Sequence, residues 1–253
     1  MFDDGFMDGH SLIHRLDARF KIVVATLFSV VIALSSRWDA LIPGIFFAIC
    51  LIFIARLSLK KVFYRLLVVN GLILFLWLFL PFSLDGTALF TFGPLTATRE
   101  GVLYASLITV RSNIILLALI CLVSTSSVFT LGRAMKQLMI PDKMIQLFFF
   151  TYRYIHVIHL EYQRLVNALK IRGFQPRTDL HTYKTYAYLV GMLLIKSYDR
   201  SENVRKAMLC RGFSGRFYDL SNFSIKSSDI VIFGAMLLVI GAIALLQWTT
   251  VLY

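Results

Sequence analysis

The amino-acid sequence predicts an all-α integral membrane protein with about five transmembrane helices plus a cytoplasmic domain of amphipathic helices. Hydrophobic residues make up 58% of the 253 positions. Several apolar runs approach the roughly 20 residues that a helix needs to cross a bilayer. Residues 125–228 carry 16 Lys and Arg against six Asp and Glu, in a chain of net charge +12. In a hydrophobic chain, such a basic segment favours the cytoplasmic face of a membrane over a nucleic-acid site.

Residues 1–123 are predicted to hold the first four transmembrane helices. Their apolar centres fall at residues 22–34, 40–55, 66–80 and 101–123. Pro81 is expected to stop the third of these helices, and Arg111 lies inside the fourth. Residues 83–98 are rich in Gly, Thr and Pro, which predicts a short hairpin at the membrane surface.

Residues 124–228 are predicted to form the cytoplasmic domain. A short helix is expected at 131–139 and a longer one at 144–169. The apolar run at 186–195 is about half the length needed to span a bilayer, and it continues into charged sequence. Helices of this kind lie in or under the membrane face. Residues 229–253 then supply the last transmembrane helix.

The charges that flank the apolar runs predict the orientation of the chain. Arg15, Arg19 and Lys21 precede the first run, and a basic cluster at 56–65 follows the second. Because positively charged loops stay in the cytoplasm, the N-terminus is expected inside and the C-terminus outside the cell inner (cytoplasmic) membrane. Residues 1–10 are acidic and lack the charge order of a signal peptide, so the first run is expected to remain as a membrane helix.

One stretch of the basic segment is repeated. Residues 168–174, ALKIRGF, return as residues 207–213, AMLCRGF, with Ala, Arg, Gly and Phe in register. Gly173 and Gly212 can each adopt the left-handed conformation that ends a helix, and the helix dipole favours the cation that precedes them. A single Arg-Gly pair would be an ordinary helix end. Its duplication within the most basic part of the chain indicates a partner that contacts both ends.

Three stretches together resemble one known family. Residues 11–19, SLIHRLDAR, look like an entry signature, the two Arg-Gly-Phe ends look like paired Ala-Arg-Gly motifs, and residues 181–213 complete the pattern. These features resemble the T components of energy-coupling-factor transporters over nearly the whole chain. Residues 181–213 are similar to the cobalt branch of that family, the CbiQ-like proteins, and the resemblance is most specific in residues 144–217. In place of the alanine of each triplet this chain has Ile171 and Cys210.

The resemblance implies a transmembrane coupling subunit of an importer for cobalt or nickel ions. In this family the helix ends dock on two ATP-binding-cassette ATPase subunits, and the membrane face holds a substrate-binding S component, here CbiM-like. The ATPase-coupling residues would be Arg172, Gly173, Arg211 and Gly212, with Ile171 and Cys210 beside them. Membrane lipids are expected as further partners, and nucleic acid is not.

No enzymatic role and no cofactor are expected of this chain. It lacks the G-x-x-x-x-G-K-[ST] loop that cradles nucleotide phosphates, so ATP would be hydrolysed by separate chains. Two alternatives stay open, an integral-membrane scaffold and a membrane enzyme such as a lipid-modifying transferase or protease, neither linked to ATPases. The apolar runs hold no paired acids, no H-E-x-x-H and no G-x-S-x-G, which disfavours the enzyme.

Other polar residues carry weaker signals. The i, i+3 spacing of His156 and His159 can place two imidazoles on one helix face, but two ligands do not complete a metal site, so none is expected. Arg111 would be costly facing lipid, and both a functional contact and a structural pairing are open for it. Glu161 with Arg164 is expected on a solvated helix face.

Overall fold

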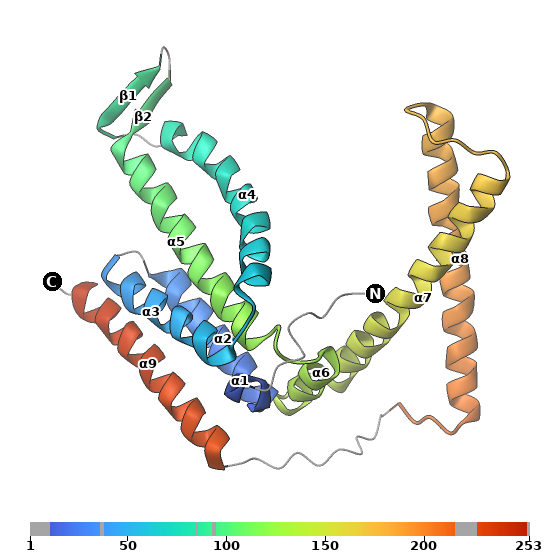
Figure 1. The fold of residues 1–253 in the computed structure, drawn as a ribbon. Coiled ribbons are helices and arrows are strands. Elements are labelled where there is room, and N and C mark those ends of the chain that lie inside the picture. Colours follow the sequence, from blue (N-terminus) through green and yellow to red (C-terminus); the bar gives the residue numbers. More distant parts are fainter. Residues whose placement is uncertain (1–10, 36–37, 84–85, 93–94, 216–226, 252–253) are drawn as a thin grey trace. The chain divides into compact units, whose positions relative to one another are not determined.

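The structure is a computed structural model that describes residues 11–35, 38–83, 86–92, 95–215 and 227–251 (Figure 1). Its elements are α1 (Leu12–Arg15), α2 (Ala18–Leu34), α3 (Trp38–Ala55), α4 (Leu59–Ser83), β1 (Ala88–Phe92), β2 (Leu95–Thr98), α5 (Arg99–Leu122), α6 (Val128–Gln137), α7 (Asp142–Ile171), α8 (Leu180–Cys210) and α9 (Ser227–Val251). Helices dominate, which confirms the predicted class. The chain divides into two compact units, residues 2–134 with 223–253, and residues 135–222.

The first unit contains a membrane bundle, which we define as α2, α3, α4, α5 and α9. Helix α5 is its centre, because α2, α3 and α4 all pack against it, while α9 packs against α2 and α3. Apolar side chains three or four residues apart form the contact faces, as expected for helices that bury one stripe. The core includes Val24, Phe28 and Ile32 of α2, Leu41, Ala48 and Leu51 of α3, Ile114, Ala118 and Cys121 of α5, and Ile240 and Ile243 of α9.

Three helices of the bundle are long and apolar enough to cross a membrane. They are Leu59–Ser83, Arg99–Leu122 and Ser227–Gln247, and they correspond to the third, fourth and fifth predicted spans. The first two predicted spans are α2, with 17 residues, and α3, with 18. At 1.5 Å per residue these two helices are about 26 Å long. They supply half of the buried residues of the shared core, so they belong to the same bundle although they are shorter.

Polar side chains inside the bundle pair with one another. Asn70 of α4 and Asn113 of α5 exchange two side-chain hydrogen bonds, 3.1 and 3.0 Å long. Arg111 of α5 donates from Nη2 to the carbonyl of Ser35, the residue that ends α2. Of the two roles open for Arg111, the structure therefore supports a structural pairing, in which a cation satisfies a carbonyl at a helix C-terminus.

The end of α5 is held by cations from two other helices. Lys21 of α2 is only 1% exposed, and its Nζ donates to Ser126 Oγ at 2.8 Å and to Thr125 Oγ1 at 3.4 Å. Arg65 of α4 donates to Ser124 Oγ at 2.8 Å. The sequence predicted Lys21 and the basic cluster around Arg65 only as charges that set the orientation. The structure adds that both side chains fasten their helices to one end of α5.

The third predicted helix does not stop at Pro81. Helix α4 continues to Ser83, because a proline near a helix end removes few backbone hydrogen bonds. The Pro81 carbonyl accepts a hydrogen bond of 3.3 Å from the hydroxyl of Thr98, which also caps α5. Between the two helices, β1 and β2 pair antiparallel, with Phe92 opposite Leu95, which confirms the predicted hairpin.

The second unit contains a helical hairpin, which we define as α7 and α8. These helices have 30 and 31 residues, so each is about 45 Å long. The apolar run that is too short to span a membrane by itself is the middle of α8. Asp179 begins this helix by accepting a 2.8 Å hydrogen bond from the backbone N–H of Thr182. Hydrogen bonds from Thr182 lower the pKa of Asp179.

Candidate functional site: two Arg-Gly helix ends

The repeated sequence forms two helix ends with matching backbone geometry. We call residues 171–173, at the end of α7, and residues 210–212, at the end of α8, the Arg-Gly ends. Gly173 has φ of 78° and Gly212 has φ of 77°. These values lie in the left-handed region that the sequence predicted, where a side chain would crowd the backbone and glycine does not.

The hydrogen bonds of the two ends also match. The N–H of each glycine donates at 3.0 Å to the carbonyl three residues earlier, Gly173 to Lys170 and Gly212 to Leu209. The N–H of each following phenylalanine donates at 3.1 Å to the carbonyl five residues earlier, Phe174 to Leu169 and Phe213 to Met208. This pair of bonds defines the Schellman motif, which satisfies carbonyls that a helix leaves free at its C-terminus.

Each Arg-Gly end presents a cation to solvent. Arg172 and Arg211 are the capping residues of α7 and α8, and both are exposed. Among the described residues neither guanidinium has a hydrogen-bond or ion-pair partner. Ile171 is 88% exposed, and Cys210 is exposed at the matching position. The two ends therefore offer the same backbone and the same cation, but a different side chain beside it.

Contacts along the hairpin pair the start of one helix with the end of the other. Gln146, near the start of α7, donates at 2.9 Å to the carbonyl of Gly215, just after α8. Phe174, just after α7, lies with its ring centroid 6.0 Å from that of Tyr186, near the start of α8. The two helices therefore run antiparallel. The two Arg-Gly ends lie at opposite ends of the hairpin, so the structure does not bring them together.

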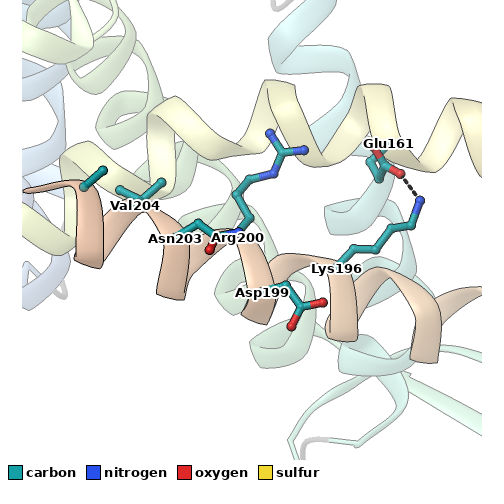
Figure 2. Close-up of a pocket in the computed structure, with 7 residues that line it drawn as sticks. Glu161, Lys196, Asp199, Arg200, Asn203 and Val204 are labelled. Atoms are coloured by element: carbon teal, nitrogen blue, oxygen red, sulfur yellow. Dashed lines mark hydrogen bonds and ion pairs between the residues drawn. The ribbon is translucent and has the colours of Figure 1, made fainter.

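The middle of the hairpin is joined by an ion pair that the sequence did not predict. Lys196 of α8 donates from Nζ to Glu161 Oε1 (Figure 2), and Arg164 Nη1 of α7 lies 3.3 Å from Glu161 Oε2. Arg164 lies on an exposed helix face, as the sequence predicted, with 73% of its side chain exposed, whereas the Glu161 side chain is 12% exposed. The hydrogen bond from Lys196 lowers the pKa of Glu161. No sequence signal links residues 35 positions apart on different helices.

The histidine pair lies on an exposed part of α7. His156 and His159 are both exposed, and His159 Nε2 lies 2.9 Å from Gln163 Nε2. Within the described part of the chain, no three His, Cys, Asp or Glu side chains gather as ligands for a metal ion.

Comparisons with known proteins place these features in a family context. The CbiQ family, described as cobalt transport protein, matches residues 9–219. A protein of Leuconostoc gelidum subsp. gasicomitatum is 28% identical over 219 residues, 82% of each chain. A protein of Streptococcus equi subsp. equi is 26% identical over 242 residues, 90% of each chain. A protein of Thermosediminibacter oceani is 23% identical over 251 residues, 94% of this chain and 95% of its own. All three relatives are named energy-coupling factor transporter transmembrane protein EcfT.

Proposed function

This chain belongs to the CbiQ family of cobalt transport proteins, and we propose that it is the transmembrane coupling subunit of an energy-coupling-factor importer for cobalt or nickel ions. The family match confirms the resemblance seen in the sequence. The names of the relatives support a transmembrane role in such a transporter. Beyond the family assignment, we propose which ions are transported and that the chain is coupled to ATPases.

The observation that carries the proposal is the duplication of one exposed, cationic helix end. Two helix ends that share φ, hydrogen bonds and a solvent-facing arginine offer the same surface twice. Two copies of one partner, or two related partners, would each accept one end. A pair of ATP-binding-cassette ATPase subunits fits this requirement, and the chain itself has no phosphate-binding loop.

The chemistry of each end suits a protein socket lined by carboxylates. An arginine can donate in parallel to both oxygens of one carboxylate, and burial in an interface strengthens that contact. The glycine beside it keeps the helix end narrow, because no Cβ projects there. Arg172, Gly173, Arg211 and Gly212 would carry the coupling, and Ile171 and Cys210 would contact the socket rim.

The membrane bundle would hold the remaining partners. Helix α4 exposes a broad apolar surface that includes Leu72, Leu74, Phe75 and Leu78, which fits lipid or a membrane-embedded S component of the CbiM-like kind. Residues 1–123 and 229–253 would form the transmembrane part, and residues 124–228 the cytoplasmic domain.

The cations at one end of the bundle support a specific orientation. Lys21 and Arg65 both contact hydroxyls at the C-terminal end of α5, so the starts of α2 and α4 lie on the same side of the bundle. Positive charge marks the cytoplasmic side. The N-terminus would therefore be cytoplasmic and the C-terminus external, in the cell inner (cytoplasmic) membrane.

The test reverses the charge of both arginines. In vesicles that contain the whole transporter, Arg172→Glu or Arg211→Glu alone should reduce ATP-dependent cobalt uptake, and the double variant should abolish it. The loss of one half of a desolvated charge pair costs on the order of 2–5 kcal/mol. Gly173→Val and Gly212→Val should act similarly, because a β-branched residue resists a left-handed conformation.

The control for this test is Arg177→Glu, which reverses an exposed arginine of the loop between α7 and α8, outside both Arg-Gly ends. This variant should retain uptake. Co-purification of ATPase chains should fall with the double variant while membrane insertion is unchanged. Full uptake by the double variant would overturn the proposal and favour a scaffold that is not linked to ATPases.

A further inference from the structure

We propose that Glu161 is the positioning residue of the helical hairpin, and that its ion pair with Lys196 fixes where α7 and α8 cross. The crossing point then sets the distance between the two Arg-Gly ends. Only the expected effect on cobalt uptake rests on the proposed function. The geometry of the hairpin itself can be measured without any partner.

Both carboxylate oxygens of Glu161 contact cations, and one of these contacts joins α7 to α8. One oxygen accepts from Lys196 of α8, and the other lies 3.3 Å from Nη1 of Arg164, one turn along α7. With 12% of its side chain exposed, Glu161 is more shielded from water than either cation. Of the ion pairs among the described residues, this one joins α7 to α8, and the others lie within one helix or beside it.

Little else in the middle of the hairpin holds the two helices in register. The buried residues of α7 and α8 are Ile145, Thr182 and Leu189, and no other described side chain of either helix is buried. Ile145 and Thr182 lie close to the ends of the hairpin, not near Glu161. A well-packed helix pair resists sliding because many apolar side chains interlock. Near the middle of this pair Leu189 is the one buried side chain among the described residues of α7 and α8, so a single polar contact has a larger share in setting the crossing.

An open surface groove lies beside the ion pair. Its volume is 510 Å³, and it is lined by Glu161 of α7 and by Lys196, Asp199, Arg200, Asn203, Val204 and Ala207 of α8 (Figure 2). Arg200 reaches from α8 toward α7, whereas Asp199 points away from it. Without the ion pair, α7 and α8 would have space to change their angle at this point.

The ion pair lies between the two Arg-Gly ends, so a small change there is amplified. Arg172 is 11 residues from Glu161 along α7, and Arg211 is 15 residues from Lys196 along α8. At 1.5 Å per residue these arms are about 16 and 22 Å long. A rotation of about 10° at the ion pair would move each end by roughly 3–4 Å, more than a hydrogen bond tolerates.

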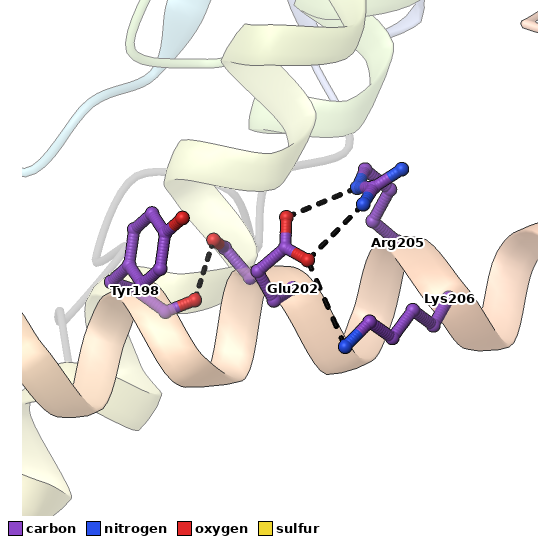
Figure 3. Close-up of polar contacts among 5 residues, drawn as sticks. Tyr198, Glu202, Arg205 and Lys206 are labelled. Atoms are coloured by element: carbon purple, nitrogen blue, oxygen red, sulfur yellow. Dashed lines mark hydrogen bonds and ion pairs between the residues drawn. The ribbon is translucent and has the colours of Figure 1, made fainter.

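Glu202 provides a matched control on the same helix. Its carboxylate also contacts two cations, Arg205 at 3.1 Å and Lys206 at 3.9 Å (Figure 3). All three residues belong to α8, so this cluster does not join α8 to α7. Replacing Glu202 removes a comparable charge cluster without affecting the crossing.

The experiment measures the distance between the two ends of the hairpin in the full chain. Spin labels are placed at Gln175→Cys and Ser214→Cys, two exposed positions just after the Arg-Gly ends, in a background without the three native cysteines. The starting protein should give one narrow distance distribution. Glu161→Gln and Lys196→Gln should each broaden or shift it, and Glu202→Gln should leave it unchanged.

A full reversal of the charges separates positioning from simple loss of folding. Glu161→Lys alone should broaden the distribution. Adding Arg164→Glu and Lys196→Glu should restore it, because the three charges then attract again with opposite signs. An unchanged distribution in Glu161→Gln, or a failure of the triple reversal to restore it in a chain that stays helical, would overturn the inference.

Uptake gives the second measurement and separates this inference from the proposed function. Glu161→Gln should lower cobalt uptake about two- to fivefold, the range expected for a partly exposed ion pair, with ATPase co-purification retained. If the Arg172→Glu, Arg211→Glu double variant keeps full uptake while Glu161→Gln still broadens the distances, the proposed function fails and the positioning role stands. If the double variant abolishes uptake and Glu161→Gln alters neither distances nor uptake, the positioning role fails alone.

Discussion

The membrane bundle and the helical hairpin differ in where their polar side chains lie and in what these side chains contact. In the bundle, Lys21 is buried, Asn70 and Asn113 are half-buried, and all three are hydrogen-bonded to residues of other segments. In the hairpin most side chains of α7 and α8 are exposed, and the polar contacts are ion pairs at the surface. Buried polar groups need partners because hydrocarbon and packed protein supply no water. Exposed groups on the hairpin remain available to a partner.

This difference indicates which part of the chain is stable alone. The bundle shares one continuous apolar core across α2, α3, α5 and α9. The hairpin has three buried residues among the 61 of its two helices. Long helices with so little burial gain stability when another protein covers them. We therefore expect substitutions to act globally in the bundle and locally in the hairpin.

The largest expected effect comes from the buried lysine of the bundle. Lys21→Ala would leave the hydroxyls of Thr125 and Ser126 without their donor and would open a cavity between α2 and α5. Such a change costs on the order of 2–4 kcal/mol of unfolding free energy. Thermal unfolding of the purified protein in detergent measures it. Lys60→Ala removes the same charge from an exposed position and should change the thermal unfolding midpoint little. Equal midpoints for both variants would contradict a stabilising role for the hydrogen bonds of Lys21.

A smaller and local effect is expected at the helix ends of the hairpin. Gly173→Ala should cost about 1–2 kcal/mol at the end of α7, because φ of 78° is strained for any residue with a Cβ. Gly191, in the middle of α8, has open space where a Cβ would be added and an ordinary helical conformation. Gly191→Ala should therefore stabilise α8 by about 0.5–1 kcal/mol.

Amide hydrogen exchange distinguishes these two variants. Exchange should become faster in residues 172–174 of Gly173→Ala, slower around residue 191 of Gly191→Ala, and unchanged in the bundle for both. If Gly173→Ala accelerated exchange throughout the bundle, the two regions would not be independent.

The smallest expected effect is a response of the hairpin to pH. The hydrogen bond from Lys196 lowers the pKa of Glu161 below its ordinary value of 4.5. A lowered pKa means that the ion pair stabilises the hairpin at pH above 4.5, and that this contribution is lost as the pH falls through the lower folded value. The spin-label distance should be constant from neutral pH down to the ordinary glutamate value and broaden below it. Glu161→Gln should show no such transition.

The sequence by itself determined the features that depend on neighbours along the chain. The apolar runs that became α4, α5 and α9 are visible as composition, since length and hydrophobicity alone decide whether a helix can cross a bilayer. The two Arg-Gly ends are equally local. Their hydrogen bonds span at most five residues, and the left-handed conformation requires only glycine at one position.

Only the tertiary structure decided which polar residues meet across the fold. Lys21 pairs with Ser126, 105 residues away, and Glu161 pairs with Lys196 on another helix. The sequence around Lys21 or Glu161 does not indicate these partners, because a distant segment of the chain supplies each of them. The hydrogen bond from Thr98 to the Pro81 carbonyl is another contact of this kind, because the two residues are 17 positions apart. Periodicity and spacing describe one helix at a time, whereas helix packing selects the contacts between helices.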